Sequence, residues 1–80
     1  MLQSSFVVFT RDAAFTYTQA QDLNGYTVAT YGPSAVSQEM HHLSKSVPAM
    51  RLEMEVDNRM VLRKLLAGRY VAPAVAVMNK

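Results

Sequence analysis

Residues 22–34 read DLNGYTVATYGPS, and this stretch decides how the chain folds. It predicts a turn at Asn24-Gly25, a strand at 27–31, and a second turn at Gly32 that opens a helix. The first N–H groups of a helix have no partner inside it, and the helix dipole adds partial positive charge there. We therefore expect a ligand contact that favours negative charge, formed by Gly32, Pro33, Ser34, Ala35 and Val36.

Strands and helices alternate along the rest of the chain. The sequence predicts strands at 5–9, 27–31, 50–56 and 70–78, and helices at 34–45 and from Asp57 or Asn58 towards Gly68. This order is typical of an α/β fold with a small, mostly parallel sheet and right-handed βαβ crossovers. Ligands of such sheets bind beyond the carboxyl ends of the strands, where Gly32-Pro33-Ser34 and the tail around Met78, Asn79 and Lys80 fall.

Apolar periodicity predicts which side of each element faces the core. The positions expected to face inward are Val36, Met40, Leu43 and Val47 in the first helix, Met50, Leu52, Met54 and Val56 in the third strand, and Met60, Val61, Leu62, Leu65 and Leu66 in the second helix. The alternation in the third strand then places Arg51, Glu53 and Glu55 on a solvated face. Pro73 is unfavourable inside a central strand, because it cannot donate a ladder hydrogen bond.

Length and composition limit the functional classes. The 80 residues suffice for one small domain, and the net charge is +2 with basic residues spread along the chain. A nucleic-acid-binding surface would need a concentrated basic patch, so we expect no nucleic-acid partner. The absence of cysteine excludes disulfides and thiolate metal sites. The longest apolar run, 71–78, is too short to span a bilayer, and we expect no signal peptide in the first residues.

The sequence carries little that predicts catalysis. His41 and His42 are adjacent on a predicted helix, so they point in different directions and cannot share one metal ion. The serines lack a nucleophile elbow, and Glu53 and Glu55 lie on the predicted solvated face. We therefore expect no enzyme activity, no metal site and no cofactor.

Three motifs occur in an order and spacing known from one family. Residues 22–29 follow its strand entry D-L-x-G-x-x-V-(G/A), and Gly32-Pro33-Ser34 falls at its Gly-(Thr/Ser)-(Ser/Thr) helix start. Residues 57–69 follow E/D-N-x-x-x-L-x-x-L-x-x-G-R, with Leu62, Leu65 and Gly68-Arg69 in place. The chain thus resembles the second lobe of a bacterial periplasmic solute-binding protein, of the polar amino-acid-binding type that serves ABC importers.

The resemblance implies that residues 1–80 form one partial lobe of a type II periplasmic-binding-protein-like fold. Its partners would be a small polar solute, an amino acid or related organic anion, and the permease of an ABC transporter. Gly32 to Val36 would supply N–H donors and the Ser34 hydroxyl. The ammonium-binding Asp of the family falls near Ala76, or at Asn79 if the strand is offset, and the Asp of its G-R-x-D motif is Val71 here. These departures argue against an α-amino-acid ligand.

Two other interpretations stay open. A lobe without its closing strand and helices would leave a sheet edge and an apolar face uncovered, which predicts a self-associating module: a homodimer or higher oligomer, with exchange of a terminal strand as one route. The same lobe also occurs as the ligand-sensing part of sensor kinases, and the sequence does not separate a transporter parent from a sensor.

Overall fold

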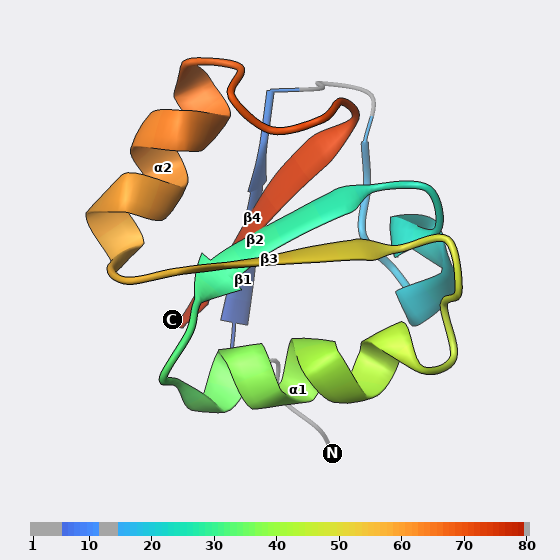
Figure 1. Ribbon diagram of the computed structural model, residues 1–80. Helices are drawn as coiled ribbons and strands as arrows, with labels where there is room; N and C mark the ends of the chain where they lie inside the picture. Colours follow the sequence, from blue (N-terminus) through green and yellow to red (C-terminus); the bar gives the residue numbers. More distant parts are fainter. Residues whose placement is uncertain (1–5, 12–14, 80) are drawn as a thin grey trace.

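A computed structural model describes residues 6–11 and 15–79 of the chain (Figure 1). Its elements are β1 (Phe6–Thr10), the short 3-10 helix η1 (Ala20–Leu23), β2 (Thr27–Tyr31), α1 (Ala35–Ser44), β3 (Arg51–Glu55), α2 (Asn58–Leu66) and β4 (Ala74–Asn79). The predicted order of four strands and two helices is confirmed. Ser5 of the predicted first strand, residues 12–14 of the predicted loop, and Lys80 lie outside the described residues.

The four strands form one mixed sheet in the order β1-β4-β2-β3. β2 pairs in parallel with β3 on one side and with β4 on the other, and β1 pairs antiparallel with β4. The chain therefore leaves β2 towards β3 and returns across the sheet to β4. The expected mostly parallel α/β sheet is confirmed, with β1 as the one antiparallel strand.

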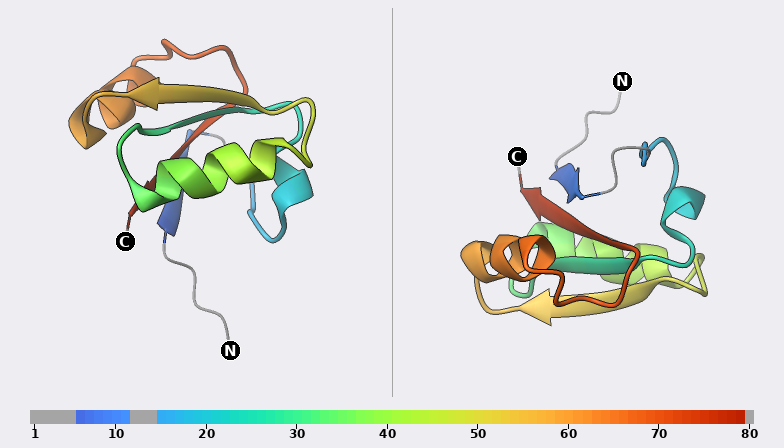
Figure 2. Two further views of the ribbon diagram at one scale, coloured as in Figure 1. Left: turned by 60° about the horizontal axis from the view of Figure 1, so that its bottom comes forward. Right: turned by 90° about the horizontal axis from the view of Figure 1, so that it is seen from above.

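The two helices cover opposite faces of this sheet (Figures 1 and 2). The face under α1 carries the larger core, built from Leu23, Val28, Val36, Met40, Val47, Met50, Val75 and Val77. The face under α2 carries a smaller core in which the sheet contributes alanines: Ala29, Val61, Leu65 and Ala76. Neighbouring strand residues such as Val28 and Ala29 divide between the two cores because strand side chains alternate between faces.

Side chains cap the starts of both helices. The Ser34 Oγ accepts a hydrogen bond from the Ser37 N–H at 3.1 Å, and the Asp57 Oδ1 accepts one from the Met60 N–H at 2.8 Å. Each bond satisfies one of the N–H groups that a helix leaves unpaired at its start. At the end of α2, Gly68 has φ +70°, a left-handed conformation that glycine adopts without steric cost.

The predicted last strand begins too early. β4 starts at Ala74 and not at Tyr70, and residues 70–73 form the connection from α2. Pro73 therefore lies just before the central strand, where its missing N–H removes no ladder bond, and its carbonyl accepts from the Thr27 N–H at 2.8 Å.

The predicted alternation in the third strand is wrong in its second half. Met54 is 45% exposed and Val56 is 75% exposed, whereas Glu55 is buried with 8% of its surface exposed. β3 is an edge strand, so the α1 core takes in Met50 and contacts Leu52 but does not extend to Met54. Glu55 points to the other face, where α2 covers it.

The inner side of α2 is narrower than predicted. Val61 and Leu65 are buried, and Leu62 packs against their core, but Met60 and Leu66 are exposed. Val61 and Leu65 are four residues apart and share one line along the helix, which is the line that meets the alanines of the sheet. The side chains on either side of this line point away from the sheet.

Candidate functional site

The predicted contact segment, Gly32 to Val36, joins the carboxyl end of β2 to α1. The Gly32 N–H donates to the Glu55 carbonyl at 2.8 Å, and the Ser34 N–H donates to the Gly32 carbonyl at 2.9 Å. The Ser34 hydroxyl donates to the Tyr31 carbonyl at 2.8 Å while it caps the helix. Its hydrogen is therefore engaged within the turn.

Two backbone N–H groups at this turn are left for a ligand. Pro33 has no N–H, and within the described part of the chain the N–H groups of Ala35 and Val36 make no hydrogen bond. They are the first two residues of α1, where the helix dipole concentrates partial positive charge. The chemical capacity of the segment is thus two N–H donors suited to a carboxylate or another anion.

Asn79 lies towards the carboxyl end of the parallel strands, as this segment does. β4 runs parallel to β2, so its carboxyl end points towards the end of the sheet where β2 ends and α1 begins, and the pairing of the two strands extends to Ala29 and Ala76. Asn79 is exposed and is the last residue of β4. The two predicted contact regions therefore lie towards the same end of the sheet, beyond the paired part of β2 and β4.

A buried hydroxyl with no partner lies close to this end of the sheet. Thr30 is in β2, two residues before Gly32, and is fully buried on the face that α1 covers. Its Oγ1 has no hydrogen-bond partner among the residues that the structure describes. An unpaired buried hydroxyl costs about 1–3 kcal/mol, so its presence calls for an explanation in structure or in function.

Glu55, Lys64 and Tyr70 form a polar cluster that the sequence did not predict. The Lys64 Nζ donates to both carboxylate oxygens of Glu55, at 3.2 and 3.0 Å, and the Tyr70 hydroxyl donates to the Oε2 at 2.8 Å. The same Nζ lies 5.9 Å from the centre of the Tyr70 ring. No spacing in the sequence marks these three residues as neighbours, because they come from β3, α2 and the connection to β4.

The cluster shifts the acidity of two of its members. Burial raises the pKa of Glu55, but hydrogen bonds from Lys64 and Tyr70 and the charge of Lys64 outweigh it, so the pKa is lowered overall. Burial raises the pKa of Tyr70 strongly, and the hydrogen bond to the Glu55 carboxylate raises it further. At neutral pH the cluster therefore holds an ionised Glu55 carboxylate and a protonated Tyr70 phenol.

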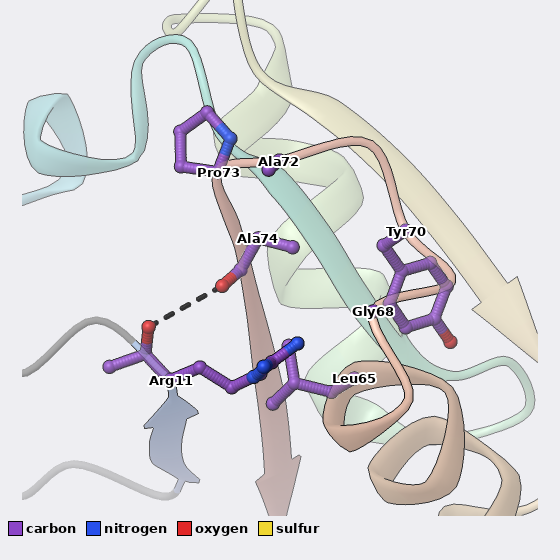
Figure 3. A pocket seen from close by; sticks show the side chains of 8 residues that line it. Arg11, Leu65, Gly68, Tyr70, Ala72, Pro73 and Ala74 are labelled. Carbon is purple, nitrogen blue, oxygen red and sulfur yellow. Dashed lines mark hydrogen bonds between the residues drawn. The ribbon is translucent and has the colours of Figure 1, made fainter.

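A cavity of about 330 Å³ lies at the opposite end of the strands, where β4 begins (Figure 3). It is lined by Thr10 at the end of β1 and Arg11 after it, by Leu65 in the last turn of α2 and Gly68 after the helix, and by Tyr70, Ala72, Pro73 and Ala74. The Thr10 hydroxyl donates to the Ala74 carbonyl at 3.4 Å. None of the predicted contact residues lines this cavity.

Residues 6–11 and 15–79 were compared with the side-chain groupings that hold metal ions in proteins. No cluster of three or more His, Asp or Glu side chains is placed there to hold an ion. His41 and His42 are both exposed on α1. None of the helices in the described part of the chain has the length and apolar character to span a membrane.

Comparisons with protein-family models, with curated proteins and with solved structures found no match for this chain.

Proposed function

We propose that this chain is one lobe of an extracytoplasmic solute-binding protein that captures a small polar solute, an amino acid or related organic anion, for an ABC importer. The observation that carries the proposal is the pair of unpaired N–H groups of Ala35 and Val36 at the carboxyl end of β2. Two donors at the positive end of a helix suit a carboxylate. The periplasmic location and the permease partner follow from the resemblance in sequence and belong to the same proposal.

The position of these donors in the sheet supports the proposal. The chain passes from β2 to β3 on one side and then returns to β4 on the other side of β2. In open α/β sheets, ligands bind outside the carboxyl ends of the strands where the strand order reverses. The segment from Gly32 to Val36 lies at this point, and Asn79 is the last residue of β4, which runs in the same direction as β2.

Replacement of Ala35 by proline removes one of the two donors with little disturbance. Ala35 is the first residue of α1, a position that proline favours, and Ser34 has the extended conformation that a residue before proline requires. Asn58→Pro is a matched control, because Asn58 is the first residue of α2 and follows an extended Asp57.

The test is an amide NMR titration of the chain with glutamate, glutamine and succinate. We expect saturable shifts at Ala35 and Val36 with at least one probe, and roughly tenfold weaker binding for Ala35→Pro, the loss typical of a hydrogen bond to a charged group. Asn58→Pro should bind like the parent chain. Absence of shifts at this segment, or equal weakening by both variants, would refute the proposal.

The free edge of β3 favours a second candidate function, a module that self-associates. Within the described residues β3 has one hydrogen-bonded neighbour, β2, and it exposes Met54 beside this edge. Such an edge can pair with a strand of another copy. Light scattering across a concentration series tests it: a mass that stays monomeric at high concentration excludes this candidate.

A further inference from the structure

Among the described residues that line the cavity at the amino end of β4, one is charged and most of the others present apolar surface. Leu65, Tyr70, Pro73 and Ala74 form the walls, and Arg11 reaches across the opening (Figure 3). The Tyr70 hydroxyl is turned away to Glu55, so the aromatic ring is what the residue presents to the cavity. Small-molecule sites in proteins are mostly apolar with a few well-placed polar groups, and this cavity is at the small end of their size range.

Arg11 has no acidic partner among the described residues. The Glu55 carboxylate, which accepts a hydrogen bond from Tyr70, is already paired with Lys64. Gly68 leaves room for the guanidinium: a β-carbon built on it would lie 3.1 Å from the Arg11 Nη1. The charge of Arg11 is therefore available to a molecule in the cavity.

We propose that this cavity binds a small monocarboxylate with an apolar, preferably aromatic, body. The planar guanidinium of Arg11 presents parallel N–H donors that match the two oxygens of a carboxylate. The apolar body would lie against Tyr70, Leu65 and Pro73, where its burial contributes the hydrophobic part of the affinity. This site is separate from the contact segment of the proposed function: it lies where β4 begins, whereas the contact segment lies where β2 ends.

The experiment is an amide NMR titration of the chain with benzoate, and with benzamide as its neutral analogue of the same shape. Arg11→Gln removes the proposed charge. Arg69→Gln is the matched control, because it changes the net charge equally at an exposed arginine that does not line the cavity. Both arginines are exposed, and circular dichroism verifies that both variants keep the fold.

We expect benzoate to shift the amides of Gly68, Ala72 and Ala74, and benzamide to bind at least about tenfold more weakly, because charge-assisted hydrogen bonds are stronger than neutral ones. Arg11→Gln should weaken benzoate binding to a similar extent, and Arg69→Gln should leave it unchanged.

Three results would overturn the inference: equal binding of benzoate and benzamide, equal weakening by the two variants, or benzoate shifts confined to Ala35 and Val36. The last result would place the anion at the contact segment, so failure of this inference is distinguishable from failure of the proposed function.

Discussion

The two faces of the sheet are stabilised in different ways. Under α1, large aliphatic side chains such as Val28, Val36 and Met40 fill the space between helix and sheet. Under α2, the sheet contributes Ala29 and Ala76, and the apolar core is correspondingly small. There the polar cluster of Glu55, Lys64 and Tyr70 closes the side of the core.

This difference shows where a small domain has room for function. On the face with the full aliphatic core, the donors left at the start of α1 are the backbone N–H groups of Ala35 and Val36. The face with the small core leaves a cavity beside Arg11 and buries a carboxylate. Apolar packing therefore dominates stability on one face, whereas hydrogen bonds and charge contribute a larger share on the other.

The largest effect is expected when one core side chain is truncated on each face, which tests the difference between the two faces. Met40→Ala should lower the free energy of unfolding by about 3 kcal/mol, because it deletes a fully buried long side chain. Val61→Ala on the other face removes less and should cost about 2 kcal/mol. Urea denaturation measures both, with exposed Leu66→Ala as a control that changes little. A larger loss for Val61→Ala would contradict the division.

Replacement of the buried carboxylate tests the polar side of the comparison. Glu55→Gln should lower the free energy of unfolding by about 2 kcal/mol at neutral pH, because Lys64 and Tyr70 lose a charged acceptor. Glu53→Gln on the same strand is exposed and should change it by less than about 0.5 kcal/mol. Equal effects of the two variants would mean that the cluster contributes no more than a surface charge.

The same variant has a defined pH signature. The folded pKa of Glu55 lies below its ordinary value of 4.5, so the carboxylate contributes stability that is complete above this value. That contribution is lost as pH falls from 4.5 through the lower folded pKa. Urea denaturation between neutral and acidic pH should therefore show that the free energy of unfolding falls less on acidification in Glu55→Gln than in the parent chain. An equal fall in both chains would argue against the lowered pKa.

The smallest expected effect is a gain in the free energy of unfolding. Thr30→Val replaces an unpaired buried hydroxyl by a methyl group of similar size and should raise the free energy of unfolding by about 1 kcal/mol. Thr27→Val is the control, since the Thr27 Oγ1 accepts from the Arg51 Nε at 3.3 Å and its loss gives no gain. Thermal denaturation measures both. A loss of stability in Thr30→Val would show that the hydroxyl has a structural role.

The sequence predicted those features that depend on neighbouring residues. The bounds of β2, the start of α2 at Asp57-Asn58 and the glycine after α2 all follow from local turn and capping chemistry. The predicted contact segment lies at the edge that the local pattern indicated, although its ligand role stays a prediction.

The features that the sequence did not predict depend on contacts between distant segments. Glu55 is buried because α2 covers its face of an edge strand, and Leu66 is exposed because α2 meets the sheet along one line of side chains. Periodicity shows that an element has two sides but not how much of each side another element will cover. The cavity beside Arg11 is formed by residues from both ends of the chain, which no local pattern brings together.

The pairing of β1 with β4 has a consequence for the order of folding. Phe6 pairs with Asn79, so this antiparallel contact joins the two ends of the described chain, whereas β2, α1 and β3 contact each other over short separations. Closing a long loop costs more entropy than closing a short one, and contacts of this kind slow folding. We therefore expect β1 to be the last strand to join the sheet. Until it does, β4 offers an open ladder to the first strand of any neighbouring copy.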